Sequence, residues 1–102
     1  MDIFSALADP TRRTILELLA QNNELPATDI YNKFQVSHPA ISQHLKVLRE
    51  AELVNVERKA QQRVYKINPQ KLSELEKWIK RLESDWEKRL DRLDTVLRKE
   101  VK

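Results

Sequence analysis

The residues whose side chains are best suited to recognise another molecule lie at helical spacing between positions 37 and 46. A glutamine amide can pair with adenine in the major groove of DNA, a serine hydroxyl can contact a base or a phosphate, and a lysine can reach guanine or a phosphate. Such a polar face is also the ordinary solvated side of a helix, which is the alternative interpretation. The residues concerned are Ser37, His38, Pro39, Ser42, Gln43 and Lys46.

A second polar group, further along the chain, is basic. Residues 37–67 hold six Lys or Arg against three Asp or Glu, whereas residues 1–36 hold three against five. Residues 68–102 add ten basic and eight acidic residues with the signs interleaved, so the unmixed basic region is the middle of the chain, where a polyanion is to be sought first. The alternatives for this group are phosphate or minor-groove contact and a merely solubilising tip. Its members are Arg58, Lys59, Gln61 and Arg63.

The composition excludes several other chemistries. None of the 102 residues is glycine or cysteine, so glycine-rich phosphate loops, disulfides, zinc ribbons and thiol nucleophiles are ruled out. No serine, histidine and acid arrangement stands out as catalytic, and we predict neither an enzyme nor a cofactor. His38 and His44 project on different faces of one helix, which argues against a metal site, and His44 is predicted to be a satisfied, partly buried histidine.

Length and hydropathy predict one soluble domain with a modest core. No segment approaches the roughly 18 apolar residues of a membrane span, and the start at Met1 shows no secretory signal. A cytoplasmic protein without membrane contact is expected.

Helix signals organise the first half of the chain. Asp9-Pro10 predicts a helix that runs to about Ala20, preceded by a shorter helix around Ile3 to Leu7, and an asparagine of 21–23 is expected in the left-handed conformation. Residues 27–34 form a second helical stretch, with Pro26 in its first turn. After a tight turn, Ser37 caps a third helix, in which Ile41, Leu45 and Leu48 face the core. Residues 27–51 match a helix-turn-helix.

Strand formers follow over residues 54–67, on both sides of a polar tip, and predict a hairpin of two strands. Because the tip lacks Asn-Gly or Asp-Gly, a loop longer than two residues is expected.

Asn68-Pro69 opens a last helix with an apolar seam whose spacing shifts after Leu82, so a bend near Glu83-Ser84 is anticipated. A long amphipathic helix needs a partner, for which a second copy is the nearest candidate. Trp78 and Trp86 share one face and are interpreted as core or interface rather than a ligand box. The predicted dimer interface consists of Phe4, Leu7, Leu75, Ile79, Leu82, Trp86, Leu90 and Leu93.

Together these elements predict a mainly α fold with a small β-hairpin. Residues 1–68 are predicted to form a winged helix-turn-helix for DNA binding, with the wing at 54–67. Residues 69–102 are predicted to form a long C-terminal dimerisation helix that is part of the same single domain.

With these elements in place, the chain resembles the ArsR-type winged helix-turn-helix repressors. The resemblance covers about residues 3–68. It is carried by FSALADPTRRTIL at 4–16, VSHPAISQHLKVLR at 36–49, AELV at 51–54 and the hairpin from Val56 to Tyr65.

The sequence departs from this family at two kinds of position. The family commonly has glycine where Glu52 stands and another near Ala60-Gln61, so each position takes an unfavourable backbone angle or the turn changes shape. Metal sensors of the family place paired cysteines in a segment that here contains Pro26 and Thr28. Others use histidines on the terminal helices, where this chain has none. A metal-independent member is therefore expected.

The resemblance implies a homodimeric transcriptional regulator, expected to be a repressor on a pseudo-palindromic operator in double-stranded DNA. Of Arg12 and Arg13, one is expected to contact a phosphate, with Arg13 counted among the DNA-binding residues, and the other to pair within the chain. The effector stays open. The rival hypothesis is a protein-interaction module that uses the long C-terminal helix to bind a partner.

Overall fold

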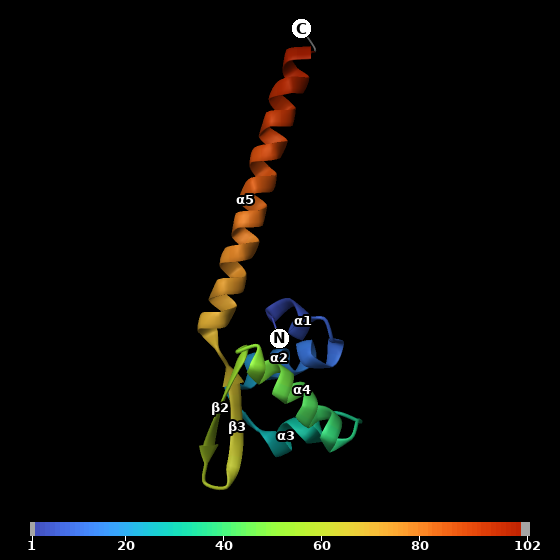
Figure 1. Cartoon of the computed structure of the whole chain (residues 1–102), viewed down its shortest axis with the longest axis vertical. Helices are drawn as coiled ribbons and strands as arrows, with labels where there is room; N and C mark the ends of the chain where they lie inside the picture. Colours follow the sequence, from blue (N-terminus) through green and yellow to red (C-terminus); the bar gives the residue numbers. More distant parts are fainter. Residues whose placement is uncertain (1, 101–102) are drawn as a thin grey trace. The chain divides into compact units, whose positions relative to one another are not determined.

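The computed structural model describes residues 2–100 of the chain (Figure 1). These residues divide into two compact units after Lys71, and each unit is described by itself. Helices α1 (Ile3–Leu7) and α2 (Pro10–Asn22) open the first unit. Each begins at an aspartate whose carboxylate accepts from free backbone N–H groups: Asp2 from Ser5 at 2.7 Å, and Asp9 from Thr11 at 2.8 Å. The predicted start at Asp9-Pro10 is confirmed.

Helix α2 continues to Asn22, slightly beyond the expected end at Ala20. The next residue, Asn23, has a positive φ of 62°, but its ψ of −58° is not that of the left-handed conformation expected of an asparagine here. The N–H of Glu24 instead bonds to the carbonyl of Asn22 at 2.6 Å, which is the pattern of a γ-turn.

Helices α3 (Ala27–Asn32) and α4 (His38–Glu50) form the helix-turn-helix. Helix α3 is shorter than the predicted 27–34, because the N–H of Phe34 turns back to the carbonyl of Tyr31 at 3.3 Å. Pro26 occupies the N-cap position of α3, without a side-chain hydrogen bond, rather than lying in the first turn of the helix. Ser37 caps α4 as predicted, its hydroxyl accepting from the N–H of Ala40 at 3.2 Å.

In the described part of the chain the sheet has three antiparallel strands, β1 (Leu25–Pro26), β2 (Val54–Lys59) and β3 (Gln62–Ile67), in the order β1-β3-β2. The sequence predicted β2 and β3 but not β1, which pairs Leu25 with Tyr65. Two residues are too few for a periodic signal, and proline is tolerated only because β1 is an edge strand.

The expected long loop at the wing tip is wrong. Lys59 pairs with Gln62, so only Ala60 and Gln61 connect the strands. Ala60 has φ 56°, and a positive φ at this first central position is what a two-residue hairpin loop demands. Alanine occupies the angle that glycine normally supplies.

At the end of α4, too, a non-glycine residue stands where a turn usually has glycine. Glu52 has φ 62°. The N–H of Leu53 bonds to the carbonyl of Leu48 at 3.0 Å, and that of Glu52 to Arg49 at 3.0 Å. This is the Schellman arrangement, whose left-handed residue is usually glycine. Both turns keep their shape, and the residue accepts the unfavourable angle.

Apolar side chains from the helices and strands of the first unit close one core. Leu48 and Leu53, which the Schellman turn brings together, are both fully buried. The buried core residues are Ala6, Ile15, Leu16, Leu19, Ile30, Ile41, Leu45, Val47, Leu48, Ala51, Leu53, Val54, Val64 and Tyr65.

Helix α5 spans Pro69–Glu100 and makes up most of the second unit. Asn68 starts it, its side-chain oxygen accepting from the N–H of Gln70 at 3.2 Å. Its 32 residues correspond to roughly 48 Å. The helix continues through Ser84 without interruption, so the anticipated bend near Glu83-Ser84 is not found (Figure 1). Over the described residues no helix is long and apolar enough to cross a membrane.

Replacing Ala60 with glycine is expected to stabilise the protein. A left-handed angle costs a non-glycine residue roughly 1–2 kcal/mol, which the glycine variant no longer pays. Glycine also raises the conformational entropy of the unfolded chain, and this offsets part of the gain in stability. The net gain should be about 0.5–1 kcal/mol in urea unfolding. The matched control Ala20→Gly, on the exposed side of α2, should lose about 1 kcal/mol. Equal or lower stability of Ala60→Gly would contradict this account of the loop.

Candidate nucleic-acid interface

Helix α4 separates an apolar side from a polar one. Ile41, Leu45 and Leu48 are buried, whereas Ser42, Gln43 and Lys46 are exposed. The first three hold the helix on the core, so the backbone that carries the polar side chains is firmly placed. The predicted division of this helix is confirmed, and its polar face is free to make contacts.

A shallow cleft of about 140 Å³ lies between this polar face and the hairpin. It brings Ser42, Gln43 and Lys46 together with Arg63 of β3, from a distant part of the sequence. Arg49 and Tyr65 also line it and were missed. Arg49 follows Ser42 by two helical turns, a spacing that would have revealed it. Tyr65 depends on the strand register and could not be read from the sequence.

The N-terminal end of α4 carries the other predicted residues of this helix. The imidazole of His38 stacks on Tyr31 of α3, with ring centroids 4.7 Å apart and planes 16° from parallel. Pro39 is exposed in the first turn. Unpaired backbone N–H groups at such a helix end favour an anion, so this end suits a phosphate.

The wing tip forms a second hollow of about 280 Å³ with the start of α3. Arg58, Gln61 and Arg63, which the sequence singled out, line it together. Thr28 of α3 lines it too and was missed, because only the folded chain brings it beside the hairpin. Two guanidinium groups and several hydrogen-bonding groups face one space, an arrangement suited to a phosphodiester backbone.

Lys59 has a different environment from its neighbour Arg58. Its ammonium lies 3.0 Å from both carboxylate oxygens of Glu24 and 3.4 Å from Glu57. The hydrogen bond to Glu24 and its charge, with a further contribution from Glu57, raise the pKa of Lys59. Its positive charge is compensated within the chain, so it offers less attraction to a phosphate than Arg58 or Arg63.

Both arginines of α2 bond to carbonyls at the end of α1. Arg12 donates to Ala6 at 2.7 Å and Ser5 at 3.0 Å, and Arg13 donates to Leu7 at 2.7 Å. The sequence assigned an internal role to one of them, and both have internal contacts. Arg13 is exposed, so its outer N–H groups face solvent, and its role toward DNA stays a prediction.

Arg12 also connects α2 to α4. Its guanidinium lies 3.2 Å from Nδ1 of His44, which must accept because arginine can only donate. Nε2 of His44 faces the carboxylate of Asp9 at 4.0 Å. His44 is partly buried, as the sequence predicted, and its Nδ1 has a hydrogen-bond partner in Arg12. Within residues 2–100 no three His, Cys, Asp or Glu side chains form a group that could hold a metal ion.

The fold and this polar cleft define a winged helix-turn-helix transcriptional regulator. A family model described as "Bacterial regulatory protein, arsR family" matches residues 9–56. The transcriptional repressor SdpR of Bacillus subtilis is 40% identical over 78 residues, which cover 76% of this chain and 86% of that protein. The chain belongs to the ArsR family, whose members bind double-stranded DNA, and it is not an enzyme.

Solved structures agree. An ArsR-like transcriptional regulator from Rhodococcus sp. RHA1 has a TM-score of 0.81 at 26% identity, covering 92% of this chain and 88% of that one. A possible transcriptional regulator for arsenical resistance has a TM-score of 0.72 at 38% identity, covering 91% and 93%. The family and the fold class predicted from the sequence are confirmed.

The two environments of the wing cations predict different effects on DNA binding. Arg63→Ala should weaken binding to all duplexes and reduce the salt dependence, log Kd against log salt, by about one unit. Lys59→Ala removes the same formal charge but one that Glu24 and Glu57 already compensate, so its effect should be clearly smaller. Fluorescence anisotropy across a salt series measures both. Equal slopes for the two variants would contradict the different roles assigned to Arg63 and Lys59.

Proposed function

We propose that this protein is a homodimeric repressor that places α4 in the major groove of a pseudo-palindromic operator and the hairpin on the flanking backbone. The observation that carries the proposal is the cleft in which Ser42, Gln43 and Lys46 of α4 meet Arg63 of the wing. SdpR, which the chain resembles over most of its length, is named a repressor.

The two halves of the cleft suit different parts of a duplex. Gln43 and Ser42 are exposed, neutral and able to donate and accept hydrogen bonds, so they suit contacts with base edges, where sequence is read. Arg63 and Arg58 carry charge on a projecting hairpin and suit the phosphates, which hold register and orientation. Lys46 and Arg49 lie further along α4, within reach of either. With two-fold symmetry, half-sites one helical turn apart would be separated by ~34 Å.

The second copy is proposed to cover the seam of α5. Leu82 is 56% exposed, Trp86 58% and Leu93 55%, although all are large and apolar. Burying such side chains against an identical helix supplies the hydrophobic driving force for association. Phe4 and Leu7 of α1 are proposed to join this interface. We accordingly propose that residues 1–68 bind DNA and residues 69–102 dimerise. Met1, Val101 and Lys102 of these ranges lie outside the described residues.

Metal independence is also part of the proposal. Pro26 belongs to edge strand β1 and Thr28 to α3, at the positions where metal sensors of the family carry thiolates. Neither side chain offers a thiolate, and the sequence has no cysteine at any position. A signal other than a soft metal ion is therefore proposed to control the protein.

Gln43→Ala should reduce the discrimination between operator and random duplex by about 1–3 kcal/mol, because a paired base edge loses its partner. The operator is first obtained by selecting bound duplexes from a random pool, and both affinities are then compared at one salt concentration. Glu50→Ala, on the same helix but outside the cleft, serves as the control. An unchanged specificity ratio for Gln43→Ala would remove this residue from the reading face.

Leu82→Asp combined with Leu90→Asp should convert the dimer into monomers in light scattering, because each carboxylate would be desolvated in the seam. Ser84→Asp with Thr95→Asp adds the same charge on the opposite side of α5 and should leave the dimer intact. Persistence of the dimer in the first variant would place the interface elsewhere. A monomeric wild-type protein would instead favour the rival hypothesis, in which α5 captures a helix of another protein.

A further inference from the structure

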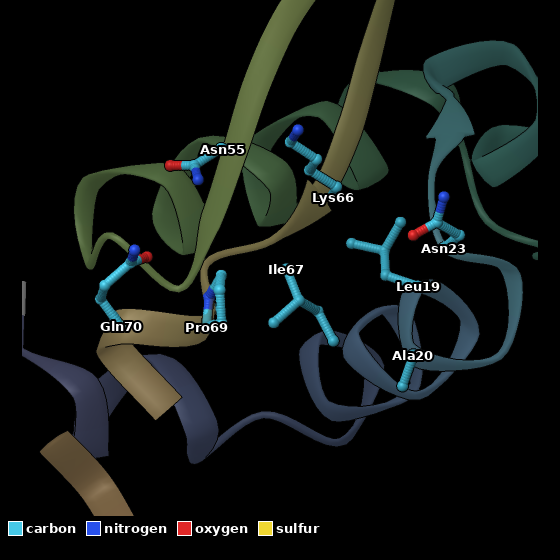
Figure 2. Close-up of a pocket in the computed structure, with 8 residues that line it drawn as sticks. All are labelled: Leu19, Ala20, Asn23, Asn55, Lys66, Ile67, Pro69 and Gln70. Atoms are coloured by element: carbon cyan, nitrogen blue, oxygen red, sulfur yellow. The ribbon is translucent and has the colours of Figure 1, made fainter. Parts of the chain in front are cut away.

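A hollow of about 530 Å³ lies outside the cleft and the wing-tip hollow, within the first unit (Figure 2). The end of α2, the two long strands and the first turn of α5 all contribute to it. None of its lining residues is among the DNA-binding or dimer-interface residues predicted from the sequence. Its volume falls in the range of sites that hold small organic molecules.

The walls of this hollow combine apolar and polar groups. The half-buried Ile67 and the exposed Ala20 and Pro69 supply apolar surface, with the buried Leu19 beneath them. Lys66, Asn55 and Gln70 are exposed polar residues that line it (Figure 2). An apolar surface beside a few hydrogen-bonding groups and one charge is the usual composition of a site for a small organic molecule.

Lys66 is a cation of the hairpin that the DNA-binding proposal does not use. Alternate residues of a strand face opposite sides of the sheet, so Lys66 projects away from the side on which Arg63 and Tyr65 line the cleft. Its cross-strand neighbour is the neutral Asn55. Among the described residues no carboxylate pairs with the Lys66 ammonium, in contrast to Lys59 with its two acidic partners.

We propose that this hollow binds a small organic monoanion, a carboxylate with an apolar body. Lys66 would pair with the carboxylate, the amides of Asn55 and Gln70 would donate hydrogen bonds to it, and the hydrocarbon would cover Ile67 and Pro69. The single cation matches a single negative charge. The apolar surface would gain nothing from a bare inorganic ion, which explains the choice of an organic anion.

Binding there would contact segments that serve different parts of the molecule. Asn23, also in the lining, ends α2, and Gln70 belongs to the first turn of α5. A ligand that bridges these segments and the hairpin would favour one position of the wing relative to α2 and thereby change DNA affinity. This regulatory role rests on the proposed function, whereas the binding site does not.

Titration of the isotope-labelled protein with benzoate, followed by amide NMR, tests the site. Saturable shifts are expected at the side-chain amides of Asn55 and Gln70, with a dissociation constant in the millimolar range. Benzamide, which lacks the charge, and acetate, which lacks the apolar body, should each bind about tenfold more weakly. Absence of saturation, or equal affinity for benzoate and benzamide, would overturn the proposal.

Variants locate the site. Lys66→Met should weaken benzoate binding about tenfold, and Asn55→Asp, which sets a carboxylate opposite Lys66, should do the same while conserving shape. Lys33→Met removes an exposed lysine that does not line the hollow and should bind as the wild type does. Unchanged affinity in both Lys66→Met and Asn55→Asp would overturn the assignment.

The regulatory role is measured separately, as the DNA affinity of the wild type and of Lys66→Met with and without saturating benzoate. A change confined to the wild type supports control through this site. Benzoate binding with unchanged DNA affinity would overturn the proposed regulation of DNA binding but not the proposed binding site. Failure of the wild type to bind any duplex would overturn the proposed function, while the NMR result would still decide the site.

Discussion

The turn that ends α4 is the constraint on which the placement of the reading helix and the wing depends. Glu52 takes a left-handed angle, which lets the N–H of Leu53 close on the carbonyl of Leu48 and buries both leucines. Asn68 then bonds to the carbonyls of Leu53 and Glu52, at 3.0 and 2.8 Å. The end of α4, the start of β2 and the start of α5 are thereby joined at one point. Any cleft between α4 and the hairpin inherits its shape from this turn.

The cations of the hairpin lie in different surroundings, because alternate residues of a strand face opposite sides of the sheet. Arg63 lies in the cleft beside α4, Lys59 is held by Glu24 and Glu57, and Lys66 lines the hollow at the end of α2. Three cations close together in the sequence thus have three different surroundings. A basic segment is accordingly a poor guide to which of its residues meet a polyanion, because strand geometry and internal carboxylates decide this.

The absence of glycine had a sharper consequence than the sequence suggested. At Glu52 and Ala60 the fold keeps the tight turn and accepts the angle, since changing either turn would displace buried Leu53 or the strand register. The predicted longer wing loop failed for this reason: local preference argued for a wider loop, and the pairing of two strands outweighed it. The third strand was missed because Leu25 and Pro26 acquire their pairing only from β3.

The sequence by itself determined the order of the elements, the caps at Asp9, Ser37 and Asn68, and the polar face of α4. These depend on contacts within a few residues, or on the period of apolar positions along one helix, and both are written in the chain. Tertiary structure alone decided that Arg63 and Tyr65 meet Gln43, that Thr28 joins the wing tip, and that Lys59 is compensated. Those outcomes need strand register and the approach of segments distant in sequence, which the packing of the whole core sets and no local pattern encodes.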